Sequence, residues 1–208
     1  MRALITSLAT IAAPLAAEAY DEPAHIVEVD DGKIQIRAYA PMIVASVDVR
    51  ADQERAPNAG FQPLGGYIFG DNRARGTIDM TVPVTQARSQ KIDMTTPVTQ
   101  APARDGVWTV SFVMPEDFTM DTLPVPNDPS ISLSERPAER VAAIRFNGGI
   151  NAKRQARKQA ELEAWIADNG YRAIGDASFA YYSPPWIPNA FRRNEVMIPV
   201  EKVVDASS

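Results

Sequence analysis

One helix-forming segment lies in each half of a chain that otherwise alternates short β-type runs with turn residues, and this pattern restricts the possible folds. Residues 152–169 have the apolar spacing of an amphipathic helix, and Gly170 follows as its C-cap. A shorter helix that ends before Gly70 is expected within residues 53–68, where Phe61, Leu64 and Ile68 recur at helical spacing. The pattern predicts an α+β domain in which two helices flank an antiparallel sheet, closed or nearly closed and built by gene doubling.

The β-type runs are rich in β-branched and aromatic residues, and turn residues bound them. They cover residues 26–29, 33–39, 42–49, 108–114, 130–135, 141–146, 177–182 and 195–200. The dipeptide Asp31-Gly32 is typical of a tight turn, so it predicts a hairpin between the first two runs. The runs 130–135 and 141–146 are expected to pair as another hairpin around Arg136-Pro137.

A nine-residue sequence occurs twice within the chain. Residues 78–86 (IDMTVPVTQ) and 92–100 (IDMTTPVTQ) differ at one position. Each copy is expected to form a β-segment with Ile and Met on one face, interrupted at its proline because proline lacks an N–H donor. Two interpretations of Met80 and Met94 remain open. Either they fill irregular space in the core, or one or both copies border a ligand pocket.

The first nineteen residues have the features of an export signal. A short positive start precedes a largely apolar stretch over residues 3–15, and Ala17-Glu18-Ala19 offers a small-x-small cleavage pattern. The apolar stretch is shorter than the roughly 20 residues that a membrane span needs. We therefore expect residues 1–19 to be a signal peptide, residues 20–208 to form a single domain, and the product to be periplasmic without a membrane span.

Composition excludes several kinds of functional site. Because the chain has no cysteine, it cannot form disulfides, Cys-based zinc sites, Fe–S clusters or thiol nucleophiles. Its one histidine, His25, cannot make a His-rich metal site. A net charge of −5 argues against a nucleic-acid partner, since such proteins need a basic face. No Gly-x-Ser-x-Gly elbow or phosphate-binding loop is present, so we expect a protein that is not an enzyme.

Six segments, taken together and in order, resemble the SOUL haem-binding protein family. The resemblance is carried by residues 60–72, 91–98, 108–115, 122–126, 141–148 and 192–196. It extends over nearly all of the expected mature domain, and the doubled Met-Thr-x-Pro-Val block is similar to the bacterial form of the family. The combination is specific, although no single segment is.

The resemblance implies a distorted antiparallel β-barrel of two pseudo-symmetric βαββ halves with two flanking helices. It also implies that haem or a related tetrapyrrole binds in a hydrophobic surface cleft without a strong axial ligand. A periplasmic carrier, buffer or scavenger is the expected role. Two alternatives stay open: an enzyme that removes or inserts the metal of a tetrapyrrole, and an envelope module that binds another hydrophobic ligand. The oligomeric state is not indicated.

A porphyrin needs a broad apolar wall and cationic groups for its propionates. The candidates for the wall are Phe61, Leu64, Ile68 and Phe69, and those for the propionates are Arg55, Arg73 and Arg75. Met94 is a candidate for soft lining, and the aromatic segment that contains Tyr181 and Trp186 either follows the cleft or packs as a loop. His25 precedes the first strand, near a chain end, and is not expected to bind the iron.

Overall fold

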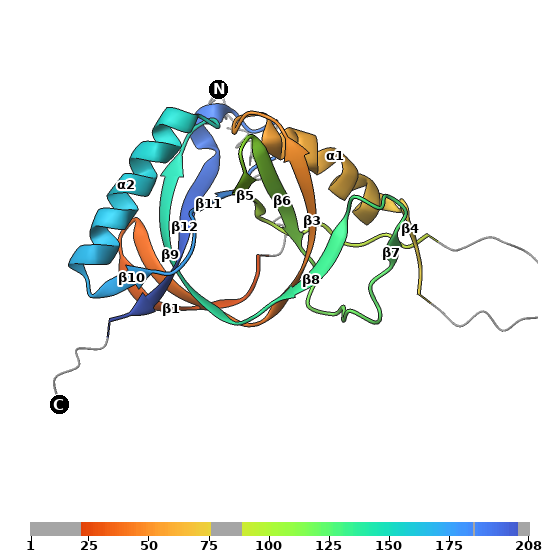
Figure 1. Cartoon of the computed structure of the whole chain (residues 1–208), viewed down its shortest axis with the longest axis horizontal. Helices are drawn as coiled ribbons and strands as arrows, with labels where there is room; N and C mark the ends of the chain where they lie inside the picture. The colour runs from red at the N-terminus through yellow and green to blue at the C-terminus, as the bar shows by residue number, and fades with distance from the viewer. Residues whose placement is uncertain (1–21, 76–88, 185, 204–208) are drawn as a thin grey trace, which may run out of the picture.

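The computed structural model describes residues 22–75, 89–184 and 186–203 (Figure 1). The expected signal peptide, the first copy of the repeated sequence with Met80, and Pro185 lie outside the described residues. The helices are α1 (Ala56–Phe69) and α2 (Ala152–Asp168), with a short 3₁₀ turn η1 (Asn189–Phe191). Within the described residues, neither helix is long and apolar enough to cross a membrane.

Strands make up most of the remaining structure. Along the chain they are β1 (His25–Asp31), β2 (Ile34–Tyr39), β3 (Met42–Arg50), β4 (Asn72–Arg73), β5 (Val98–Arg104), β6 (Val107–Val113), β7 (Val125–Pro126), β8 (Ser132–Arg136), β9 (Glu139–Asn147), β10 (Tyr171–Ala173), β11 (Ser178–Tyr181) and β12 (Arg193–Lys202). The predicted β-type runs coincide with the observed strands to within two residues, because their turn residues end them where expected.

The large sheet is antiparallel, and its strand order is β1-β2-β9-β12-β11-β5-β6-β3-β8, with β10 paired to β12. The order contains two similar units. In one, α1 follows β3, and β5 and β6 return beside it. In the other, α2 follows β9, and β11 and β12 return in the same way. The α+β prediction is confirmed. Closure of the sheet into a barrel is not confirmed, because the end strands β1 and β8 do not pair with each other in the described residues.

The predicted hairpin around Arg136-Pro137 is wrong. β8 pairs with β3, whereas β9 pairs with β2 and β12. The short breaks at residues 40–41 and 137–138 face each other, since Tyr39 lies opposite Glu139 and Met42 lies opposite Arg136. At each break a proline interrupts the pairing without reversing the chain. β2–β3 and β8–β9 are therefore two long strands that bend together (Figure 1).

Each helix covers one half of the sheet and closes one hydrophobic core. Leu162 and Ile166 of α2 pack on a cluster from β2, β9, β11 and β12. Leu64 and Ile68 of α1 pack on a cluster from β3 and β6. The apolar stripe of each helix is buried in this way, and such burial contributes most of the stability of a short helix.

α1 begins at Ala56, within the segment 53–68 where a helix is expected. The backbone N–H of Ala56 donates to the carbonyl of Asp52 at 2.9 Å. Pro57 then occupies the first turn of the helix. A backbone N–H in this turn would have no acceptor within the helix, so the lack of an N–H in proline costs nothing there. The predicted end is confirmed, because Gly70 adopts φ +124° directly after Phe69.

The second copy of the repeated sequence enters the core. Ile92 is buried, and Met94 packs against the cluster under α1. The Thr95 hydroxyl donates to the carbonyl of Val113 in β6. Core packing is thus confirmed for Met94, and the same side chain also borders the cavity described below.

Candidate ligand cavity

A cavity of about 180 Å³ lies where the first turns of α1 meet the loop between β11 and β12. Its apolar lining is aromatic and aliphatic, and the principal residues are Phe61, Met94, Val98, Ile150, Tyr181 and Trp186. Asn58, Thr95, Thr96, Ser183 and Asn194 add polar groups. Arg192 is the one cationic residue among the described residues that line it. The site can therefore hold an apolar, flat group near a single guanidinium.

Contacts between α1 and the sheet place Phe61 at the cavity. A Cβ added at Gly60 would lie 2.4 Å from the Cβ of Val110. The helix therefore approaches β6 so closely at this point that only glycine fits. The next residue, Phe61, packs its ring against Phe112 with the centroids 5.4 Å apart. Its side chain is 36% exposed, so one side of the ring remains available to the cavity.

A buried amide network holds the hydroxyl of Tyr181. This oxygen accepts hydrogen bonds from Nε2 of Gln100 at 2.7 Å and of Gln155 at 2.8 Å. Oε1 of Gln155 accepts in turn from Gln53 at 3.2 Å. Burial raises the pKa of Tyr181 above its ordinary value, and the two amide hydrogen bonds offset this only in part. Tyr181 is therefore a neutral phenol whose oxygen is engaged in this network.

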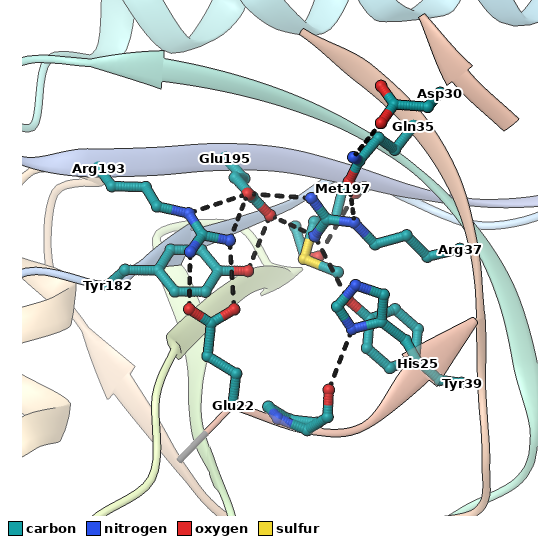
Figure 2. A network of polar contacts seen from close by, with 12 residues as sticks. Glu22, His25, Asp30, Gln35, Arg37, Tyr39, Tyr182, Arg193, Glu195 and Met197 are labelled. Carbon is teal, nitrogen blue, oxygen red and sulfur yellow. Dashed lines mark hydrogen bonds and ion pairs between the residues drawn. The ribbon is translucent and has the colours of Figure 1, made fainter. Parts of the chain in front are cut away.

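The second tyrosine of the cavity, Tyr182, is bound to a buried charge cluster (Figure 2). Its hydroxyl donates to Oε2 of Glu195 at 2.7 Å. Glu195 is 0% exposed and accepts two hydrogen bonds from Arg37, at 2.7 and 3.1 Å. Arg193 donates to the same carboxylate at 2.9 Å, and its guanidinium carbon lies 3.7 Å from the centroid of the Tyr182 ring. The cluster fixes the orientation of this cavity residue.

The cluster continues to the N-terminal end of the described chain. Arg193 donates to both carboxylate oxygens of Glu22, at 2.6 and 3.2 Å. The His25 ring packs at a tilt of 43° against Tyr39, with the ring centroids 5.1 Å apart, and its Nδ1 lies 3.1 Å from the carbonyl oxygen of Pro23. His25 therefore packs with the charge cluster, as Figure 2 shows, and is not among the residues that line the cavity.

Glu195 is ionised in the folded protein. Burial alone would raise the pKa of its carboxyl group. The hydrogen bonds and charge of Arg37, the charge of Arg193 and the Tyr182 hydroxyl outweigh that cost and hold the pKa below its ordinary value of 4.5. The unfolded chain consequently takes up a proton at a higher pH than the folded chain does.

This difference predicts how stability depends on pH. The contribution of the Glu195 charge is complete above the unfolded pKa of 4.5 and is lost as the pH falls through the lower folded value. We expect the difference in unfolding free energy between the wild-type protein and Glu195→Gln to narrow as the pH is lowered below about 4.5. Urea unfolding of both proteins at neutral and acidic pH measures this difference in unfolding free energy. A difference that stays constant over this range would contradict the assignment.

The structure places some of the predicted site residues at the cavity and others elsewhere. Phe61, Met94, Tyr181 and Trp186 line the cavity. Leu64 and Ile68 are 0% and 1% exposed in the core beneath α1, so their prediction as ligand wall is corrected. They share an apolar face with Phe61 in sequence, but that part of the face is covered by the sheet.

The other four predicted residues are not among those that line the cavity. They are Arg55 at the N-cap of α1, Phe69 at its last residue, Arg73 in β4, and Arg75. Phe69 is eight residues beyond Phe61, which corresponds to about 12 Å along a helix. The arginines after the helix lie beyond Phe69 in the chain. Contact of these four residues with the same ligand as Phe61 stays a prediction.

Sequence reasoning missed several polar residues of the cavity. Asn58 belongs to the first turn of α1, where Pro57 and Gly60 interrupt the helical pattern of the sequence. Arg192 and Asn194 fall in one of the segments that carried the family resemblance, and this was the only signal for them. Nδ2 of Asn194 donates to the carbonyl of Gly148 at 2.7 Å, which ties the start of β12 to the segment before α2.

Comparisons with known proteins agree with the sequence resemblance. The family model described as SOUL heme-binding protein matches residues 20–199. Heme-binding protein 2 of Mus musculus is 27% identical over 170 residues, which cover 80% of this chain and 78% of the mouse protein.

The likeness to solved structures extends to the whole domain. The C-terminal domain of EcmrR has a TM-score of 0.59 at 18% identity, over 82% of this chain and 98% of that one. A hydrolase from Listeria innocua has a TM-score of 0.53 at 16% identity, over 84% and 94%. At such identities these two structures show a shared fold alone. The family model covers nearly the entire described domain, and the chain therefore belongs to the SOUL heme-binding protein family.

Proposed function

We propose that this protein binds haem or a related tetrapyrrole in the cavity between α1 and the loop from β11 to β12. The observation that carries the proposal is the lining itself, in which four aromatic side chains and Met94 stand beside one guanidinium. Flat apolar ligands are held by such surfaces, and a carboxylate on the ligand pairs well with arginine. The name of the mouse relative supports the same class of ligand.

The size of the cavity determines how such a ligand is held. Sites that enclose a drug-sized molecule usually measure about 300–1,000 Å³. This cavity measures about 180 Å³, so a tetrapyrrole enters it only in part. Phe61, Tyr182 and Trp186 would contact one edge or face of the ligand, and Arg192 would be the cation nearest its propionates. Partial burial gives modest affinity and rapid release, as suits a carrier, buffer or scavenger.

Firm axial ligation is not part of the proposal. A tyrosine binds iron as the phenolate, but burial raises the pKa of both Tyr181 and Tyr182 above the ordinary value. The Tyr182 hydroxyl also donates a hydrogen bond to Glu195, and a phenolate could not make this bond. The thioether of Met94 remains as a weak ligand among the lining residues.

The arrangement of ionisable residues in the described chain favours a binding role over a catalytic one. Within the described chain no group of three or more His, Asp or Glu residues is arranged to hold a catalytic metal. Glu195, at the centre of the charge cluster, is buried and is paired with Arg37 and Arg193. We therefore propose a binding protein. An exported, periplasmic location is proposed from the N-terminal sequence, whose charged start, apolar stretch and Ala-x-Ala pattern support it.

A haemin titration tests the proposal. We expect a saturable change in the Soret band and quenching of tryptophan fluorescence at micromolar haemin. Trp186→Ala should weaken binding by roughly tenfold, since a stacked aromatic contact is worth about 1–1.5 kcal/mol. Trp186 is 71% exposed, so the variant should fold normally.

Phe69→Ala serves as the matched control, because Phe69 is an exposed aromatic residue outside the cavity and should leave affinity unchanged. Absence of any saturable response in the wild-type protein would refute haemin binding. Free porphyrin released from haemin by substoichiometric protein would instead establish an enzyme.

A further inference from the structure

Two large aromatic side chains project into solvent from the loop at the cavity mouth. Trp186 is 71% exposed and Phe191 is 74% exposed. The loop is closed at its base, where the N–H of Tyr182 donates to the carbonyl of Arg193 at 3.2 Å. Its tip packs toward the start of α2, since the amide of Asn189 lies about 3.1 Å from a Cβ added at Gly149. Exposed aromatic residues held on a closed loop are typical of an interaction surface.

Basic residues occupy the first two turns of α2, next to this loop. Lys153, Arg154, Arg157 and Lys158 lie there, and the first acidic residue of the helix is Glu161. The N-terminal end of a helix carries a partial positive charge, so cations at this end oppose the helix dipole. Lys158 is neutralised by Glu161 at 2.6 Å, but Lys153 and Arg157 are exposed. Their placement costs local stability and is explained by an anionic partner.

The N-terminal end of α1 reaches the same region. Oε1 of Glu54 accepts from the N–H of Ala152 at 3.0 Å, so the two helix starts are in contact. Both lie on one side of the molecule (Figure 1). Arg55 at the N-cap of α1 is exposed, and Arg192 lines the cavity between the helices. The acids near the two helix starts and the cavity include Asp52, Glu54 and Glu22; Glu54 accepts from that amide, and Glu22 is paired with Arg193. Cations therefore predominate locally, although the whole chain carries −5.

The combination identifies the kind of partner. Exposed tryptophan and phenylalanine beside Lys and Arg are the features of surfaces that insert into the headgroup region of an anionic bilayer. A soluble polyanion would use the basic residues but gain nothing from exposed apolar rings. Because charges are screened beyond about 8 Å at physiological salt, the local cations outweigh the net negative charge of the distant surface.

We infer that the cavity mouth docks on an anionic lipid bilayer through Trp186, Phe191 and the basic first turns of α2. The purpose of docking rests on the proposed function, because it lets a hydrophobic ligand pass between bilayer and cavity without crossing water. The docking itself needs no ligand. Its test is therefore separate from the haemin titration, and either can fail without the other.

Vesicle sedimentation of the full chain without haemin tests the inference. We expect binding to vesicles of equal parts phosphatidylcholine and phosphatidylglycerol, and little binding to phosphatidylcholine alone. The double variant Trp186→Ala, Phe191→Ala should partition into vesicles about tenfold more weakly. The blue shift of tryptophan fluorescence that we expect when the wild-type protein binds vesicles should be lost in this variant. Each of Lys153→Gln and Arg157→Gln should weaken partitioning about fivefold. The exposed side chains make normal folding of these variants the expectation.

Control variants remove two exposed apolar side chains, or one exposed charge, elsewhere on the surface. Phe69→Ala with Ile174→Ala removes two exposed apolar side chains, and Lys33→Gln removes an exposed charge, all outside the cavity lining. These variants should partition like the wild-type protein. Failure of the wild-type protein to bind anionic vesicles overturns the inference. So does binding that heparin abolishes and that the loss of both aromatic residues leaves unchanged, which would mark a site for a soluble polyanion.

Discussion

Glu195→Gln is expected to lower the free energy of unfolding by about 3–5 kcal/mol, the largest effect of any single isosteric change in this protein. The substitution leaves Arg37, which is 4% exposed, with its charge in the protein interior and no carboxylate to neutralise it. It also removes one of the two carboxylates that pair with Arg193, and it replaces the charged acceptor of the Tyr182 hydroxyl with a neutral amide. A buried charge without its partner costs far more than the pair contributes when both are present.

Glu28→Gln provides the matched control for this measurement. Glu28 pairs with Arg140 through two hydrogen bonds, at 2.5 and 2.9 Å, but both side chains of that pair are about a third exposed. Water compensates for the lost contact there, and the expected cost is at most about 1 kcal/mol. Urea unfolding of both variants, followed by circular dichroism at neutral pH, makes the comparison. Equal costs for the two substitutions would contradict a structural role for the buried cluster.

Glu195 also shows why part of the site was invisible in sequence. The segment around it reads as an ordinary β-run, and nothing in that run distinguishes a buried carboxylate from a solvated one. Its partner Arg37 is 158 residues away in the chain. The two meet because β2 and β12 both pair with β9, so the contact exists only once the strand order is known. Local patterns carry no information on such pairings.

Strand positions could be predicted from sequence because they depend on local residue types. The D-G turn and the β-branched runs identified β1, β2 and β6 to within two residues. The hairpin expected between β8 and β9 failed for a different reason. Adjacent runs often pair, but here the proline-containing breaks continue each strand around a bend. Whether a short break reverses or bends the chain depends on the opposite strand, which the local sequence does not specify.

The residues predicted as a ligand wall on α1 differ in exposure for a geometric reason. Helical spacing shows that Phe61, Leu64 and Ile68 share one face, and that face is indeed apolar. It cannot show how far the sheet extends beneath the helix. β6 and β3 cover Leu64 and Ile68, and the edge of that contact falls at Phe61. The aromatic segment after β11 was left open between loop and cleft, and the structure places it along the cavity.

Leu64→Ala should therefore act on stability and leave ligand binding nearly unchanged. Leu64 is 0% exposed in the core between α1 and the sheet, so its truncation removes buried apolar area and opens a void. The expected cost is about 2–5 kcal/mol of unfolding free energy, measured by urea unfolding. Phe69→Ala removes a larger side chain that is 57% exposed on the same helix, and should cost less than about 1 kcal/mol.

Haemin titration of folded Leu64→Ala separates the two possible roles of this residue. If Leu64 belongs to the core alone, affinity should stay within about twofold of the wild-type value, whereas Trp186→Ala should lose roughly tenfold. A Leu64→Ala variant that keeps its stability but loses haemin affinity would return this residue to the ligand wall. That result would mean that α1 tilts away from β6 when the ligand binds, and that the close contact of Gly60 with Val110 opens.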